Sequence, residues 1–266
     1  MLPPEILPAL HADGQRCTIA GYASLMDCES ARLTTPSLIN FRYGAVEGYA
    51  RIFNLVSIVN IQRGLATGQH LATATARPSP AHRLLVCLFD VPVGELPSLL
   101  QRERRLRHSC VPFREVGTGS GSGQDEGEPN KCVLFTEYSD DEYFRERCGG
   151  DEAVFHDEVG QFYRGRRIYR DDLLPVPSYL VRCVRAHRQV GDRAFLANFL
   201  DGSFLGDGKT TVRAYLRAEL AGGAPRAHHG AVARAEDDRV PDDAPAKPHW
   251  TPSEREELAR AVAEEA

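Results

Sequence analysis

The chain has 266 residues, of which 42% are hydrophobic and 26% are charged, and its 37 acidic and 32 basic side chains give a formal net charge of −5. This composition is that of an ordinary globular protein, long enough to bury one large core or two small ones. The slight acidic excess and the lack of a long basic stripe argue against nucleic acid or an anionic membrane as the main partner.

The sequence predicts neither a membrane-spanning helix nor an export signal. The longest apolar run, residues 84–93, is interrupted by Asp90 and Pro92, whereas a membrane-spanning helix needs about 18 apolar residues. The first residues lack the positive charge and apolar core of a secretory signal. We therefore expect a cytoplasmic protein.

Seven cysteines are spread along the chain without any Cys-x-x-Cys pair. An odd number with no repeated spacing predicts neither a disulfide framework nor a zinc site. A free cysteine among apolar residues behaves as a small buried side chain. We expect this of Cys17, Cys87, Cys132 and Cys183.

The first half of the chain alternates short apolar runs with turn residues, which is typical of strands. The expected strands are residues 17–20, 45–53, 83–91 and 131–138. Before the last of them, residues 97–107 predict an amphipathic helix with a proline in its first turn. Glu103 interrupts the apolar stripe of this helix, because it follows Leu99 by four residues and Leu100 by three.

Two later stretches are expected to contribute little to the core. Residues 117–130 are rich in Gly, Ser and acidic residues and predict a flexible insertion within one domain, with a linker between two domains as the alternative. Residues 221–266 predict a mostly disordered tail that ends in a short solvated helix over 251–264. Between these stretches, apolar residues after Pro175 recur at three- and four-residue spacing, which predicts two or three closing helices.

Two catalytic motifs are excluded by their spacing. Residues 206–211 (Gly-Asp-Gly-Lys-Thr-Thr) lack the first glycine of a phosphate-binding loop, whose position is occupied by Ser203. We expect a helix-to-helix turn there, with Gly202 as the helix stop. Ser24 is not flanked by glycines two residues away on either side, as the serine of a hydrolase nucleophile elbow would be.

Three segments with polar residues remain as candidate functional motifs. They are residues 21–26 (Gly-Tyr-Ala-Ser-Leu-Met) after the first strand, residues 48–53 (Gly-Tyr-Ala-Arg-Ile-Phe), and Arg102-Glu103 on the helix. Their order resembles the γ-glutamylcyclotransferase-like superfamily over residues 17–140. The signature of that superfamily is a Tyr-Gly-Ser-Leu or Tyr-Gly-Ser-Asn loop, a Gly-Tyr-x-Arg-x-Phe strand and a glutamate on a helix. The sequence looks most similar to the ChaC-like, glutathione-specific branch, in which the glutamate often follows an arginine.

The resemblance implies an α+β fold, a small β-barrel flanked by helices, within residues 1–220. It implies that Glu103 is the catalytic acid and base in converting glutathione, or another γ-glutamyl amine or peptide, to 5-oxoproline and the released amine. Partial burial of this carboxyl would raise its pKa toward the working range. The turn residues implied to bind the substrate are Tyr22, Ala23, Ser24 and Leu25. The chemistry implies no metal or cofactor, and the oligomeric state is open.

Two departures from the family pattern favour an alternative, a catalytically inactive member that binds γ-glutamyl ligands or regulates. Ala23 replaces the loop glycine, and alanine would be strained if this position needed a positive φ. Phe135 stands about where the branch has a tyrosine. Glu103 could also be the ion-pair partner of a neighbouring arginine, and the turn could be an ordinary connection to a helix capped by Asp27. Arg51 is expected to be a solvated strand residue.

Overall fold

The computed structural model describes residues 2–66, 68–116, 130–222 and 250–264. Residues 117–129 of the expected insertion at 117–130, and the greater part of the expected tail at 221–266, therefore lie outside the described residues. Among the described helices, none combines the length and apolarity that are needed to cross a bilayer.

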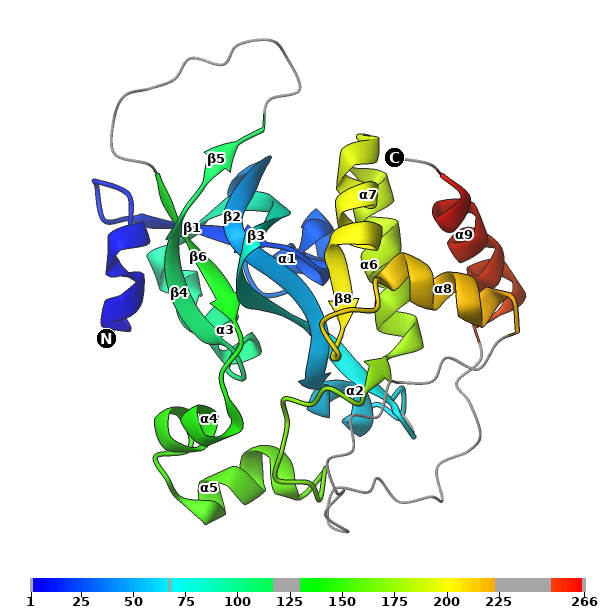
Figure 1. Cartoon of the computed structure of the whole chain (residues 1–266). Helices are drawn as coiled ribbons and strands as arrows, with labels where there is room; N and C mark the ends of the chain where they lie inside the picture. Colours follow the sequence, from blue (N-terminus) through cyan, green and yellow to red (C-terminus); the bar gives the residue numbers. More distant parts are fainter. Residues whose placement is uncertain (1, 67, 117–129, 223–249, 265–266) are drawn as a thin grey trace.

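In the described part of the chain, one curled sheet of eight strands forms the centre of the molecule (Figure 1). Six strands follow the order β4-β6-β1-β3-β2-β5, while β7 pairs with β3 and β8 pairs with β2. The strands are β1 (Arg16–Gly21), β2 (Ile39–Val56), β3 (His70–Pro92), β4 (Arg107–Pro112), β5 (Arg114–Glu115), β6 (Lys131–Thr136), β7 (Leu174–Pro175) and β8 (Ser203–Leu205).

The two longest strands curl the sheet into a half-barrel. β2 and β3 pair antiparallel with several register shifts, and such bulges increase the local twist. β3 pairs with β1 along its second half and with β6 at Ala76. Because β6 also pairs with β1, these three strands form a closed circuit. The expected α+β class, with a barrel-like sheet flanked by helices, is confirmed.

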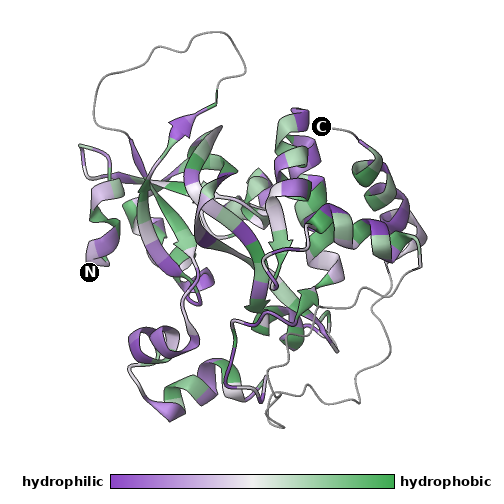
Figure 2. Cartoon of the chain, in the orientation of Figure 1, coloured by the Kyte–Doolittle hydropathy of each residue, from purple (hydrophilic) through white to green (hydrophobic). Residues whose placement is uncertain are grey.

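Helices cover the half-barrel on two sides (Figure 1). The α-helices are α1 (Cys28–Arg32), α2 (Ile58–Gln62), α3 (Leu96–Arg102), α4 (Asp140–Arg147), α5 (Glu152–Phe155), α6 (Pro177–Gln189), α7 (Arg193–Gly202), α8 (Val212–Leu220) and α9 (Pro252–Ala263). Short 3-10 segments are η1 (Pro4–Ala9), η2 (Ser24–Met26) and η3 (Val93–Glu95), and η4 (His156–Gly160) is a π-helical turn. Helices α6 and α7 pack against the sheet and bury mostly apolar residues, and Figure 2 shows hydrophobic and hydrophilic residues alternating along both helices.

Two elements differ from the sequence expectation. Helix α3 ends at Arg102 rather than at residue 107, because the chain turns there to enter β4, and the N–H of Leu106 closes the turn by donating to Glu103 O at 2.9 Å. The segment after α7 is not a simple turn, because residues 203–205 form β8 and pair parallel with β2. A short strand of three residues carries too little periodicity to be recognised in a sequence.

Helix α9 is half-buried rather than solvated. It packs against α6 and α8, and Leu258 and Ala261 have 0% exposure. Arg213 Nη1 donates to Val262 O at 2.8 Å, and Arg185 pairs with Glu257 at 2.7 Å. The apolar residues of this helix thus extend the core beyond the 1–220 region.

The four cysteines that were expected to be buried have no exposed surface: Cys17, Cys87, Cys132 and Cys183 each show 0%. Burial raises the pKa of the Cys17 thiol to about 12. A thiol that stays protonated at neutral pH is a poor nucleophile. The interpretation of these cysteines as core residues is therefore confirmed.

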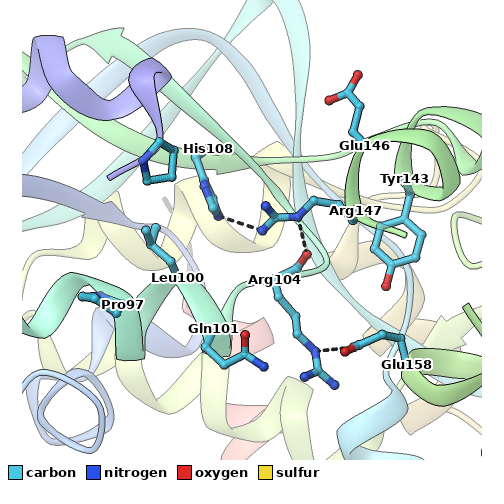
Figure 3. Close-up of a pocket in the computed structure, with 10 residues that line it drawn as sticks. Pro97, Leu100, Gln101, Arg104, His108, Tyr143, Glu146, Arg147 and Glu158 are labelled. Carbon is cyan, nitrogen blue, oxygen red and sulfur yellow. Dashed lines mark hydrogen bonds and ion pairs between the residues drawn. The ribbon is translucent and has the colours of Figure 1, made fainter. Parts of the chain in front are cut away.

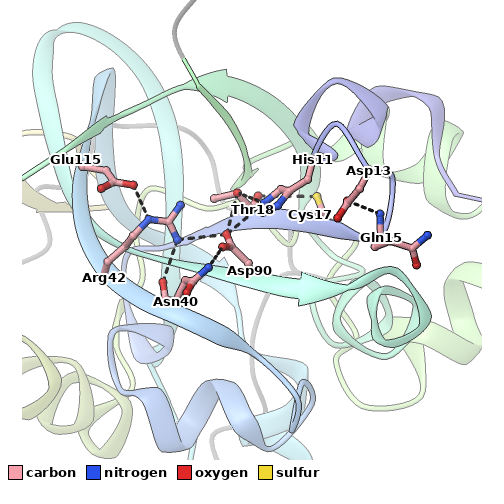
Figure 4. A network of polar contacts seen from close by, with 9 residues as sticks. All are labelled: His11, Asp13, Gln15, Cys17, Thr18, Asn40, Arg42, Asp90 and Glu115. Atoms are coloured by element: carbon pink, nitrogen blue, oxygen red, sulfur yellow. Dashed lines mark hydrogen bonds and ion pairs between the residues drawn. The ribbon is translucent and has the colours of Figure 1, made fainter. Parts of the chain in front are cut away.

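A polar network explains how the acid in the apolar run of β3 is accommodated (Figure 4). Asp90 is 2% exposed and accepts hydrogen bonds from Thr18 Oγ1 at 2.9 Å, Asn40 Nδ2 at 2.8 Å and Arg42 Nη1 at 3.2 Å. Burial by itself raises the pKa of Asp90, but these donors and the charge of Arg42 together lower it. The network joins β1, β2 and β3 at one end of the half-barrel.

Candidate active site

The turn that follows β1 is folded tightly against the sheet. Gly21 ends β1 opposite Cys87 of β3, and a Cβ at Gly21 would lie 2.6 Å from Leu25 Cβ and 2.8 Å from Cys87 Sγ. Cys87 Sγ donates to Leu25 O at 3.1 Å, and the Cys87 N–H contacts Met26 Sδ at 3.0 Å. Asp27 then caps α1 by accepting from the N–H of Glu29. The glycine that this turn requires is therefore Gly21.

Ala23 has a φ of −135°, so the strain expected from a left-handed backbone is not found. The residue is 7% exposed. Its carbonyl accepts from the Met26 N–H, and the Ser24 carbonyl accepts from the Asp27 N–H. The N–H groups of Ala23, Ser24 and Leu25 find no acceptor among the residues that the structure describes. These three donors are thus not used in hydrogen bonds within the described part of the chain.

Arg102 ties the end of α3 to the helix that follows this turn. Its Nη1 donates to Ser30 O at 2.8 Å and lies 3.4 Å from Thr34 Oγ1. Ser30 belongs to α1, the helix that the turn leads into, so this hydrogen bond fixes the end of α3 against α1. Glu103 is the first residue beyond α3, and its N–H still donates to Leu99 O at 3.0 Å.

The Glu103 carboxylate is largely buried and has one close cation. Its side chain is 19% exposed, and Oε1 lies 3.1 Å from Arg102 Nε. Burial raises the pKa of Glu103, while the Arg102 charge opposes this rise. Glu103 in turn helps to raise the pKa of the Tyr22 and Tyr179 hydroxyls, in both cases after burial as the largest cause. The contact with Arg102 is the ion pair that the alternative, structural role of Glu103 leads us to expect.

Arg51 lies behind the turn and has 0% exposure, so the expectation of a solvated strand residue is wrong. Its Nε donates to Tyr22 O at 2.5 Å and its Nη1 to Ser203 Oγ at 2.6 Å. The Arg51 guanidinium also lies 5.1 Å from the centre of the Phe199 ring. The reason is that β2 is an inner strand, flanked by β3 and β8 and covered by α7. Burial lowers the pKa of Arg51 to about 10.

Phe135 meets the turn through its backbone. Tyr22 Oη donates to Phe135 O at 2.6 Å, close to the point where β3 and β6 pair. The Phe135 ring is 1% exposed and lies edge-on to His108 at 5.8 Å. The phenylalanine ring is therefore part of the hydrophobic core, and its carbonyl binds the Tyr22 hydroxyl.

A separate cavity of about 320 Å³ lies beside α3. Its lining includes Gln101, Arg104, His108 and Arg147 but not Glu103. Figure 3 shows Arg147 between the His108 ring, 3.2 Å from Nη2 to Nε2, and Arg104 O, which accepts from Arg147 Nε at 2.9 Å. The lining of this cavity also contains no residue of the turn at 21–26.

The sequence motifs assign Glu103 and the turn to one site, but they give no role in it to three further residues. Tyr179 lies within the spacing pattern that predicts the closing helices and receives no site role from it, and Cys87 is expected only as a core residue. Arg51 belongs to the quoted strand motif, yet its burial on both faces of a strand leaves no signal in a single sequence. Among the described residues, no group of three or more His, Cys, Asp or Glu side chains is arranged to hold a metal ion.

Comparison with known proteins yields structural similarity only. No protein-family model and no curated protein matches the sequence. A solved gamma-glutamyl cyclotransferase is 16% identical with a TM-score of 0.36, covering 47% of this chain and 68% of that chain. A yeast gamma-glutamyl cyclotransferase specific to glutathione is 13% identical with a TM-score of 0.38, covering 66% and 88%. YkqA from Bacillus subtilis is 12% identical with a TM-score of 0.37, covering 65% and 49%.

Two of these structures are named as gamma-glutamyl cyclotransferases. At TM-scores below 0.5, however, the similarity does not by itself establish a shared activity.

Proposed function

We propose that this protein is a γ-glutamylcyclotransferase that converts glutathione, or another γ-glutamyl amine or peptide, to 5-oxoproline and the released amine. The observation that supports this most is the position of Glu103. Its carboxyl is 19% exposed, has a pKa raised by burial, and directly follows Arg102, whose hydrogen bond to Ser30 O ties this end of α3 to the helix after the turn. The order of the motifs in the sequence supports the same assignment.

In the proposed reaction, the neutral α-amino nitrogen of the γ-glutamyl group attacks its own γ-carbonyl carbon. The new C–N bond closes the five-membered lactam, and the amide C–N bond to the leaving amine breaks. Glu103 accepts the proton that the attacking nitrogen loses and donates it to the departing nitrogen, so the protons balance without a cofactor. A carboxyl with a raised pKa is better matched to both transfers than an exposed one.

The turn supplies the complementary electrostatics. Negative charge develops on the γ-carbonyl oxygen during the attack, and prearranged N–H donors stabilise such charge strongly in a buried site. The N–H groups of Ala23, Ser24 and Leu25 are the proposed donors to this oxygen or to the charged end of the substrate. Holding the γ-glutamyl chain folded at the turn adds the proximity effect of an intramolecular reaction.

The test is release of 5-oxoproline from glutathione and from several γ-glutamyl amino acids. We expect Glu103→Gln to lower kcat by ~10²- to 10⁴-fold, the usual contribution of a general acid and base. Glu158→Gln is the matched control, because Glu158 pairs with Arg104 at 2.6 Å much as Glu103 pairs with Arg102. No product from any substrate, or undiminished turnover in the Glu103 variant, would contradict the proposal.

The Arg102–Glu103 ion pair also favours a second candidate, an inactive module that binds γ-glutamyl ligands or regulates. Here Glu103 would serve to hold the end of α3. Calorimetric titration with glutathione and with 5-oxoproline distinguishes the two, because the module binds a ligand and releases no product.

A further inference from the structure

We propose that Arg51 strengthens and orients the Ala23 N–H as a donor to an anionic oxygen, acting through the Tyr22–Ala23 peptide bond and without touching the ligand. The inference rests on the proposed function only in taking that oxygen to be the γ-carbonyl oxygen of the substrate. Arg51 is thus a positioning residue.

The first observation is that Arg51 is a buried cation without an acidic partner in the described part of the chain. It has 0% exposure, and no carboxylate oxygen lies within 4.0 Å of it among the residues described. The buried arginines Arg170 and Arg213 instead pair with aspartates, each at 2.6 Å. Removing an unpaired charge from water costs several kcal/mol. A buried arginine that has no carboxylate partner indicates that its positive charge serves a function.

The second observation is the direction of its shortest hydrogen bond. Arg51 Nε donates to Tyr22 O at 2.5 Å, a charge-assisted bond. The C=O of Tyr22 and the N–H of Ala23 belong to one planar trans peptide, so they point in opposite directions. A positive charge at the oxygen draws electron density from the nitrogen, which makes the N–H a stronger donor.

The third observation is that the guanidinium is locked in place. Arg51 Nη1 donates to Ser203 Oγ at 2.6 Å, and Nη2 lies 3.5 Å from His187 Nε2. His187 Nδ1 lies 2.7 Å from Cys183 O and donates to it, which leaves Nε2 as an acceptor for Arg51. These partners on β8 and α6 therefore keep the Arg51 guanidinium from reaching a ligand. Its charge can act on the ligand only through the Tyr22–Ala23 peptide bond.

An amide NMR experiment tests the polarisation without any turnover. In the full chain labelled with ¹⁵N, Arg51→Met removes the charge and the bond to Tyr22 O, and we expect the Ala23 ¹⁵N and ¹H resonances to move upfield. Arg51→Lys keeps a cation and should shift Ala23 less. Arg213→Met is the matched control, because it removes a buried arginine that pairs with Asp201. If Arg51→Met does not fold, the Lys variant carries the comparison with the control.

Kinetics provide the second readout. We expect Arg51→Met to lower kcat ~10-fold, within the range for outer partners of a site, with KM changed less than about threefold because the ligand contacts remain. Arg51→Lys should recover part of the loss, and Arg213→Met should leave kcat unchanged. If wild type forms no 5-oxoproline, the proposed function fails and the Ala23 resonance alone decides the role of Arg51. An Ala23 shift no larger than in the control, or an unchanged kcat in a folded Arg51→Met enzyme, would overturn the inference.

Discussion

Substituting Gly21 by alanine tests whether the turn after β1 is held as closely as its contacts indicate. The added Cβ would lie 2.6 Å from Leu25 Cβ and 2.8 Å from Cys87 Sγ, whereas an ordinary contact begins at 3.4 Å. Leu25 Cβ is next to the backbone, so the turn itself has to move by about 0.8 Å to relieve the first contact. Overpacking of this kind costs ~1–3 kcal/mol, and two short contacts place the expected loss near the upper end.

Activity should fall further than stability suggests, because the displaced turn carries the proposed donors. A misplacement of about 1 Å can cost roughly 10²-fold in rate. Urea unfolding gives the free energy of unfolding, and 5-oxoproline release gives the activity. Both are measured on Gly21→Ala and on two controls.

Gly94→Ala is the first control, since a Cβ there meets nothing within 4 Å; it should be neutral or stabilising by up to ~1 kcal/mol. Ala23→Gly is the second, because a φ of −135° does not require glycine; it should cost ~1 kcal/mol and keep the turn in place. A Gly21→Ala protein within 0.5 kcal/mol of wild type, with equal activity if wild type is active, would refute the close packing inferred for the turn.

Two further predictions concern stability alone. Burial, followed by the Arg147 charge, lowers the pKa of His108 from 6.5 to about 4, so the folded protein binds a proton there less readily than the unfolded chain. The free energy of unfolding therefore decreases as the pH falls from 6.5 toward 4, by up to ~3 kcal/mol from this side chain. Between pH 7 and pH 4.5, the His108→Gln protein should lose correspondingly less of its free energy of unfolding, measured with urea. Equal losses in the variant and in wild type would disprove this prediction. At α9, Leu258→Ala should lower the free energy of unfolding by ~2–4 kcal/mol, because the side chain has 0% exposure. Glu257→Gln should lower it by less than ~1 kcal/mol, because its partner Arg185 is 53% exposed. Thermal or urea unfolding that reverses this order would contradict the packing of α9.

Patterns within a few residues were sufficient for much of the secondary structure. Alternation and run length predicted the cores of β1, β2, β3 and β6, and three- and four-residue spacing predicted α6, α7 and α8. The proline in the first turn of α3 and the cap at Asp27 were also visible. These features depend on neighbours along the chain, so a single sequence records them.

The candidate site was only partly accessible in this way. Glu103 stood out because an acid interrupts an apolar stripe, and the turn stood out through its resemblance to a family motif. The sequence could not show that Gly21, rather than position 23, is where a Cβ has no room. Nor could it show that Arg51 is buried against the carbonyl of Tyr22.

The sequence by itself determined the class of the fold, the order of its main elements and one acid that does not fit its helix face. Tertiary structure decided which side chains surround that acid and which arginine lies behind the turn. The reason is that burial of β2 on both faces, and the contact between Gly21 and Cys87, arise from segments more than 60 residues apart in the chain. Such contacts depend on how the sheet curls, and no local pattern encodes them.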